Sequence, residues 1–250
     1  MISGRGATAA DTLRLSRVPL ILNYHQVAEV TENALCVTPG RFAEQMAWLK
    51  RHGLRGVGVG TLIDAMHAGR QRGLVGITFD DGYASLMEAA LPALLRHGFT
   101  ATMFIVSGLL GGTNEWDEGW AWPLMSAEHV RDLAAAGMEI GSHSITHLRL
   151  SGADADQLEA EVSDSRASLS DLLGAAIRGF AYPYGSMDAA ARQAVRDAGY
   201  DYACAAMTPM NGLGPMALPR MFIAECDGDI RMAAKRILFR PYFAVHGRRA

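Results

Sequence analysis

The sequence lacks the features that mark secreted, disulfide-bonded or membrane-spanning proteins. Its three cysteines, Cys36, Cys204 and Cys226, are widely spaced and form neither a disulfide framework nor a CxxC metal motif. We expect reduced, mostly buried thiols. No run of about 18 apolar residues occurs that would cross a membrane, and the first residues lack the roughly 7 to 15 apolar residues of a secretory signal. These absences predict a cytoplasmic protein without a membrane span.

A strong charge of one sign is also absent. The 23 Lys and Arg residues oppose 26 Asp and Glu, with a formal net charge of -3, so no basic field attracts a phosphate backbone. Nucleic acid is therefore not an expected partner. No repeat or low-complexity tract divides the 250 residues, which are enough for one large core. We predict one catalytic domain over residues 17–245, preceded by an N-terminal tail over residues 1–16.

Short apolar runs alternate with amphipathic stretches, which is typical of βα units around a parallel sheet. Strands are expected from residue 18, at 55–59, 74–79, from 101, at 138–141 and 177–181, with two short ones later. Helices are expected at 61–69, 154–173 and 188–198. Others are expected to run from residue 39 to Gly53, to end at Gly98, to begin at Ser126 as the N-cap with Glu128 nearby, and to begin at residue 229. This α/β pattern alone fits either a barrel or an open sheet.

Three groups of ionisable residues come directly after expected strands: His25, the pair Asp80 and Asp81, and the pair His143 and His147. In parallel α/β folds the loops at the carboxyl ends of strands converge on one face. One Asp and two His are a sufficient ligand set for a catalytic zinc-type ion. Taken singly, Asp-Asp-Gly is also a common turn, and a single His is more often a hydrogen-bonded structural residue. Together the groups supply metal ligands, a base and an acid; the other histidines, His52, His67, His97, His129 and His246, are expected at the surface.

Three motifs carry a family resemblance: TFDDG at residues 78–82, GSHSITH at 141–147 and AYPYG at 181–185. Their order and spacing resemble the polysaccharide deacetylase family, carbohydrate esterase family 4, over about residues 18–220. The resemblance implies a distorted (β/α)7-type barrel. It also implies metal-dependent hydrolysis of an N-acetyl group from an amino sugar.

The resemblance assigns roles to individual residues. Asp80 corresponds to the general base, and Asp81, His143 and His147 correspond to the ligands of one divalent metal ion, with zinc as the expected ion. Such an ion polarises the amide carbonyl and acidifies bound water. The backbone N–H of Tyr184 corresponds to an oxyanion donor. Without the resemblance, the YPYG segment would be interpreted as an ordinary turn.

The sequence departs from the family pattern at two places. Ala181 stands where most members carry an arginine that orients the base; Arg178 or Arg220 is the candidate substitute, with a surface role as the alternative for Arg178. The C-terminal Leu-x-His motif is also missing. NYHQV at 23–27 resembles the N-terminal motif of the branch similar to poly-N-acetylglucosamine deacetylases. His25 is then the candidate proton donor, a role that suits an imidazole with an ordinary pKa of about 6.5.

The loop at 111–123 holds Trp116, Trp120 and Trp122, whose rings either stack on sugar or pack the loop onto the barrel; Trp48 is expected in the core. Asp117 is a candidate acceptor for a sugar hydroxyl. The expected substrate is a carbohydrate, an N-acetylated sugar that is nucleotide-linked, lipid-linked or oligomeric, and a cytoplasmic location favours a precursor. The alternatives are hydrolysis of another C–N or O-acyl bond at the same site, or a non-catalytic sugar-binding module. The sequence indicates no oligomeric state.

Overall fold

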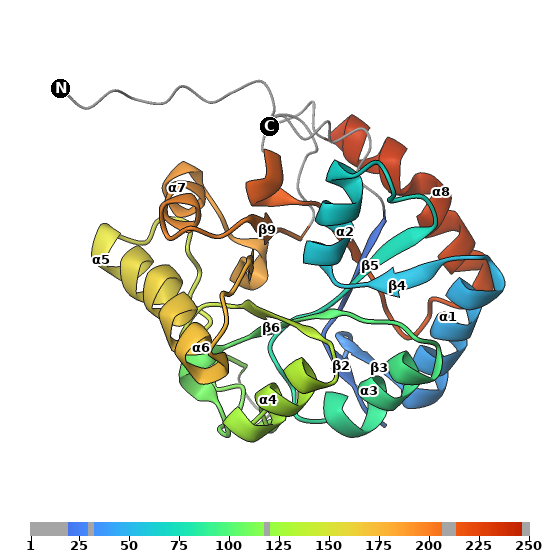
Figure 1. Cartoon of the computed structure of the whole chain (residues 1–250), viewed down its shortest axis with the longest axis horizontal. Coiled ribbons are helices and arrows are strands. Elements are labelled where there is room, and N and C mark those ends of the chain that lie inside the picture. Colours follow the sequence, from blue (N-terminus) through green and yellow to red (C-terminus); the bar gives the residue numbers. More distant parts are fainter. Residues whose placement is uncertain (1–19, 30–32, 118–120, 207–213, 247–250) are drawn as a thin grey trace.

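The computed structural model describes residues 20–29, 33–117, 121–206 and 214–246; the expected tail, residues 1–16, and Trp120 lie outside these ranges. A parallel sheet of eight short strands lies at the centre, with helices around it (Figure 1). Its strands are β1 (Ile21–Tyr24), β4 (Arg55–Val57), β5 (Leu74–Phe79), β6 (Thr102–Ile105), β7 (Glu139–Ser142), β8 (Gly179–Ala181), β9 (Tyr202–Cys204) and β10 (Met221–Phe222). The expected alternation of strands and helices is therefore correct.

The sheet closes on itself through a short segment near its C-terminal end. The strand order is β10-β1-β5-β6-β7-β8-β9, and β4 pairs with the first half of β5 beside β6. Leu218 forms a parallel bridge to Cys204 in β9, while β10 pairs in parallel with β1. Residues 218–222 thus join the two ends of the sheet, which confirms the expected distorted barrel.

The helices lie on the outside of this barrel (Figure 1). They are α1 (Pro39–Arg51), α2 (Val59–His67), α3 (Leu86–Arg96), α4 (Ala127–Ala135), α5 (Ala155–Leu158), α6 (Ser165–Leu173), α7 (Ala189–Asp197) and α8 (Asp229–His246). A π-helical stretch, η3 (Glu159–Asp164), joins α5 to α6, so the long helix expected at 154–173 is continuous but not uniform. Single 3-10 turns are η2 (Ser107–Leu109), η4 (Pro183–Gly185) and η5 (Gly214–Ala217). In the part of the chain described above, no helix combines the length and apolarity that crossing a membrane requires.

Local sequence signals explain where the helices begin. Thr38 caps α1 by accepting a hydrogen bond from the Arg41 N–H at 3.2 Å, and Pro39 occupies the first turn, where its missing N–H costs nothing. Ser126 caps α4 as expected, with Glu128 in the first turn, and its capping-box partner is His129. His129 is accordingly half-buried, not a freely exposed surface residue.

The core lies between the sheet and the helices and contains Trp48, as expected. Cys36 and Cys204 are buried, as expected, and Cys226 is exposed. Cys36 belongs to a second, two-stranded sheet, β2 (Gln26–Val27) with β3 (Cys36–Val37), that the sequence did not predict. Two-residue strands are too short to show a period of two, so no sequence signal marked them.

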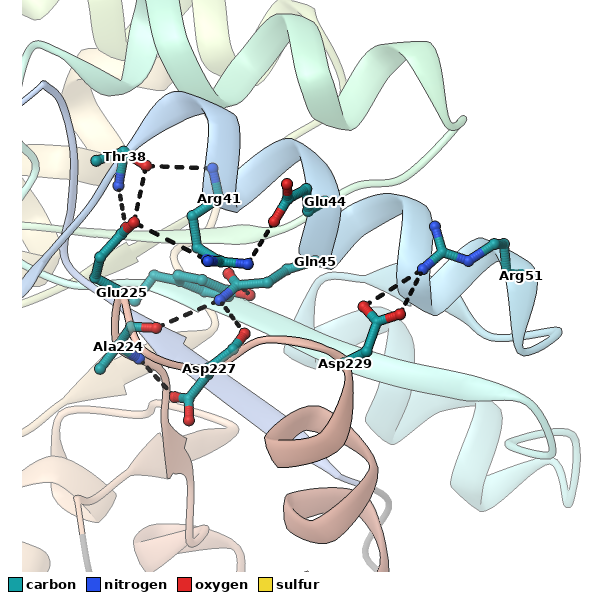
Figure 2. Close-up of polar contacts among 10 residues, drawn as sticks. Thr38, Arg41, Glu44, Gln45, Arg51, Ala224, Glu225, Asp227 and Asp229 are labelled. Atoms are coloured by element: carbon teal, nitrogen blue, oxygen red, sulfur yellow. Dashed lines mark hydrogen bonds and ion pairs between the residues drawn. The ribbon is translucent and has the colours of Figure 1, made fainter.

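A polar network fixes the start of α8 against α1 (Figure 2). Gln45, buried in α1, donates to the backbone oxygen of Asp227 at 3.0 Å and accepts from the Tyr24 hydroxyl at 3.0 Å. Both ends of its amide are therefore satisfied inside the protein. Further contacts in this network join Thr38 to Glu225, Arg41 to Glu225 and Arg51 to Asp229. The same network holds Tyr24, the last residue of β1, next to the site described below.

Candidate active site

Nine of the residues that the sequence marks as candidates line one cavity of about 400 Å³: His25, Asp80, Asp81, Trp116, Asp117, His143, His147, Tyr184 and Arg220. This cavity lies at the carboxyl ends of the strands, because His25 follows β1, Asp80 follows β5 and His143 follows β7. Strands β1 and β5 pair in register at Tyr24 and Phe79, so His25 and Asp80 lie side by side. The parallel sheet thus brings together groups that are more than a hundred residues apart in sequence.

Asp81, His143 and His147 form a compact group of possible metal ligands. All three are buried, and one ligand atom from each lies within 4.8 Å of the others. The Asp81 Oδ1 is 3.3 Å from the Nε2 of each histidine. The His143 Nδ1 is 2.7 Å from the Ala181 carbonyl oxygen, so Nδ1 donates there and Nε2 keeps its lone pair for a metal. Three ligands of this kind fit one divalent ion with a position left for water.

The electrostatics keep the Asp81 ligand ionised. Burial alone would raise the pKa of Asp81, but hydrogen bonds from His143 and His147 outweigh it and hold that pKa well below its ordinary value. Burial disfavours the charged form of His143 too, yet its contacts with Asp81 and Asp80 raise its pKa, whereas burial prevails for His147 and lowers its pKa. A metal ion bound at Nε2 displaces any proton there.

Asp80 is held by a buried arginine. Its Oδ1 and Oδ2 accept hydrogen bonds from the two terminal nitrogens of Arg220 at 2.6 and 2.7 Å. Arg220 also donates to the Thr78 hydroxyl and to the Ala205 carbonyl. Burial would raise the pKa of Asp80, but Arg220 above all, with His143 and His25, lowers it. The two-pronged contact fixes the plane of the carboxylate as well as its charge.

Of the two arginines considered in place of the one missing at Ala181, Arg220 is the one that contacts Asp80. Arg178, the other candidate, lies elsewhere: it pairs with Asp64 at 2.9 Å and with Asp201 at 2.7 Å on the exposed surface. Ala181 instead contributes its backbone carbonyl to His143. Of the two substitutes considered from the sequence, the structure selects Arg220 and excludes Arg178.

His25 lies on the other side of Asp80. Its Nε2 is 3.9 Å from the Asp80 Oδ2, too far for a hydrogen bond, and its ring meets the edge of Phe222. The His25 Nδ1 is buried and has no hydrogen-bond partner within the described residues. The side chain is 15% exposed, so it can exchange a proton with a molecule in the cavity.

Aromatic rings pack against His147, whose Nδ1 makes no hydrogen bond within the described residues. Trp116 stacks on the His147 ring with a centroid distance of 4.2 Å, and Tyr184 meets it edge-on at 4.5 Å. Trp116 therefore packs the loop against a ligand while it lines the cavity, which combines features of both roles considered for it. Asp117, next to it, lines the cavity and accepts from the Asn114 amide at 2.9 Å.

Backbone strain is concentrated at this site. Among the described residues, the non-glycine residues with positive φ are Asp81 (71°), Ser144 (68°), His147 (66°) and Tyr184 (57°). Such conformations are uncommon for residues with a Cβ atom and persist where surrounding contacts enforce them. The Ser144 hydroxyl accepts the His147 N–H at 3.0 Å, which is one such contact. Three of the four strained residues are candidates from the sequence.

Glu161 is a site residue that the sequence analysis missed. It is buried in η3 and accepts hydrogen bonds from the Ile145 and Thr146 backbone N–H groups, each at 2.9 Å, and from the Thr146 hydroxyl at 2.5 Å. It thereby fixes the loop between the two histidine ligands. A signal was present: Glu161 lies on the helical face of the buried residues Leu158 and Val162, where a charged residue is unexpected.

Replacing Glu161 by alanine is expected to weaken metal binding by about tenfold to a hundredfold, as loss of an outer contact to metal ligands typically does. The loop at 145–146 would lose three hydrogen bonds while the ligands themselves stay. Metal affinity is measured by competition with a chromophoric chelator. Glu159→Ala, an exposed change in the same helical stretch, is the matched control. Equal affinities for the Glu161 variant and the control would show that the loop does not depend on Glu161.

The curled parallel sheet and the buried Asp-His-His group together define a barrel with a candidate centre for a divalent metal ion. A family model described as polysaccharide deacetylase matches residues 67–203, more than half of the chain, so the chain belongs to the polysaccharide deacetylase family. This confirms the family expected from the three motifs.

Two proteins of known sequence illustrate the relationship. The Bacillus subtilis (strain 168) protein YxkH is 27% identical over 76% of this chain, and the match spans 64% of the length of YxkH. The poly-beta-1,6-N-acetyl-D-glucosamine N-deacetylase of Staphylococcus aureus (strain N315) is 24% identical over 82% of this chain and 79% of its own length.

Solved structures show the same fold. The Streptococcus pyogenes deacetylase PplD, in complex with acetate, superposes with a TM-score of 0.75 at 22% identity, covering 86% of this chain and 96% of PplD. IcaB from Ammonifex degensii superposes with a TM-score of 0.72 at 25% identity, covering 86% of this chain and 95% of IcaB.

Proposed function

We propose that this chain is a metal-dependent N-deacetylase that removes acetyl groups from N-acetylglucosamine units of a glycan or glycan precursor, with zinc as the ion. The observation that carries the proposal is the buried group of Asp81, His143 and His147 next to the paired Asp80 and Arg220 in one cavity. Family membership and the N-acetylglucosamine deacetylase among the relatives support the substrate class. Location in the cytoplasm stays a prediction.

Asp81, His143 and His147 would hold a divalent ion, which would supply a Lewis acid for the amide carbonyl and make a water molecule more acidic. Asp80 lies beside the ligand Asp81 and is ionised, so it accepts the proton of the attacking water. Arg220 donates two hydrogen bonds to the Asp80 carboxylate. Asp80 is therefore held charged and in one orientation by Arg220.

The other residues of the cavity serve the leaving group and the sugar. Protonated His25, across from Asp80, donates its Nε2 proton to the departing amine. The Tyr184 N–H, presented by a turn with φ of 57°, is the proposed oxyanion donor. Trp116 and Asp117 at the cavity wall offer a ring face and a carboxylate to the sugar.

Acetate release from a panel of N-acetylated sugars, free, nucleotide-linked and oligomeric, tests the proposal. Purified protein is expected to release acetate from at least one member, to lose this activity on chelation and to regain it with zinc, because the Lewis acid is removed and restored. O-acetylated sugars in the same panel separate deacetylation of amides from that of esters. Metal-containing protein that releases no acetate from any amide would contradict the proposal, and sugar binding without release would favour a binding module.

A further inference from the structure

Helix α8 presents an apolar face to solvent as well as to the core. Ile230, Ile237 and Leu238 are exposed to 87%, 72% and 54%. With Ala234 they occupy positions i, i+4, i+7 and i+8, which lie on one side of a helix. We call these four residues the α8 stripe. The opposite side of the helix, represented by Phe239, is buried, so the stripe is not needed to hold α8 on the barrel.

Basic residues accompany the stripe. The sequence of α8 contains one acidic residue, Asp229, and four Lys or Arg residues: Arg231, Lys235, Arg236 and Arg240. The Asp229 carboxylate is already paired with Arg51 of α1 at 3.2 Å (Figure 2). Arg231 and Arg236 are exposed. Arg231 borders the stripe beside Leu238, and Arg236 lies on the other side, about 100° further round the helix than Ile237. The even charge distribution expected from the whole sequence therefore fails locally at α8.

A second basic segment lies beside the helix. Arg72, in the loop GRQRG at residues 69–73, lines the same cavity as Arg236 and is exposed. Arg70 in this loop is exposed too. Two segments far apart in sequence thus place arginines next to the same helix, and no carboxylate belongs to the described residues that line the cavity between them.

We propose that the α8 stripe docks on the surface of an anionic lipid bilayer. Apolar side chains in the middle and cations at the edges are the arrangement of a helix that lies in the headgroup region, with arginines on lipid phosphates. Nucleic acid would leave the isoleucines without apolar partners. A symmetric contact between two copies would bring the arginines of both helices together, since a two-fold interface places the same patch on both sides.

The α8 stripe is adjacent to the catalytic cavity. The helix follows β10, whose Phe222 lines the catalytic cavity. Phe222 also lines a second cavity, of about 480 Å³, together with Ala234 and Leu238 of the stripe. The stripe and the catalytic cavity are therefore adjacent through Phe222, whereas the cavity lined by Arg72 and Arg236 also contains Leu20 and Leu74, at the amino ends of β1 and β5.

Vesicle flotation of the full chain tests this surface. We expect binding to vesicles of phosphatidylglycerol and phosphatidylcholine, weak binding to phosphatidylcholine alone, and weaker binding at high salt because the cations are screened. The double variant Ile230→Gln/Ile237→Gln and the double variant Arg231→Gln/Arg236→Gln are each expected to bind about tenfold more weakly. Their melting temperatures should equal that of the unmodified chain, because these side chains are exposed.

Leu95→Gln is the matched control, since Leu95 is a 50% exposed leucine on α3, and it is expected to bind as the unmodified chain does. Equal binding to both vesicle types, or unchanged binding by both double variants, would overturn the proposal. A dimer in light scattering that the isoleucine variant dissociates, without vesicle binding, would identify the stripe as a contact between copies. Binding to duplex DNA in place of vesicles would likewise refute a lipid partner.

Discussion

Asp80→Asn is expected to lower kcat by a factor on the order of 10² to 10⁴, the usual loss when a general base is removed, while the protein keeps its metal. Asn cannot accept the proton of the attacking water, but it leaves Asp81, His143 and His147 in place. The change also leaves the buried Arg220 without its carboxylate, so the melting temperature is measured alongside. Acetate release and metal content of the same sample separate loss of the base from loss of the ion.

His143→Ala is the comparison for this experiment. It removes one of three ligands and is expected to lose both metal and turnover, because an Asp and a single His do not make a three-ligand catalytic site. The two variants therefore differ in metal content and agree in inactivity. Full activity in Asp80→Asn would show that another group takes the proton, and stoichiometric metal in His143→Ala would show that the ion binds elsewhere.

The fold was predictable where an apolar run is long enough to be recognised as a strand, as at β5. The mostly apolar run LVGITF of β5 stands out in the sequence, and the structure gives β5 the same bounds, Leu74–Phe79. Closure of the barrel was not predictable in this way. It depends on Leu218 and on β10, a two-residue strand, and so short a segment has no periodicity to read.

The clustering of the candidate residues followed from one physical rule, that the carboxyl ends of parallel strands meet at one face. The identity of the arginine beside the base did not follow from it. Arg178 and Arg220 are equivalent in a linear sequence, but Arg178 immediately precedes β8, at its amino end, whereas Arg220 lies in the closing segment that borders β1. Only the three-dimensional pairing separates them.

Glu161 and the rings around His147 show a second limit of the sequence. Motifs identify side chains that carry out chemistry, whereas the contacts that orient those side chains come from elements far away in the chain. The two histidine ligands are oriented differently, His143 by the Ala181 carbonyl and His147 by Trp116 and Tyr184. Ala181 and Tyr184 belong to the third motif, but the motif does not show that the Ala181 carbonyl meets His143 or that the Tyr184 ring meets His147.

Arg220→Met is expected to destabilise the protein by about 3–5 kcal/mol at neutral pH, because it leaves the buried carboxylate of Asp80 unpaired. Burial then raises the pKa of Asp80 in place of the lowering that Arg220 causes. A folded-state pKa above the unfolded value of about 3.9 costs stability as pH rises through it, so the deficit should shrink as pH falls from 7 toward 4.

The matched control for this change is Arg178→Met. It removes an arginine that also pairs with carboxylates, Asp64 and Asp201, but at the surface. Surface pairs contribute roughly 0–1 kcal/mol, so this variant should unfold nearly like the unmodified chain and keep its turnover. Urea unfolding at several pH values measures the free energy of both variants. Protonated Asp80 cannot act as a base. As pH is lowered, turnover of any folded Arg220→Met protein should therefore be lost at a higher pH than turnover of the unmodified chain. Equal stability losses for the two variants would mean that the pairing of Arg220 with Asp80 contributes no more than a surface contact.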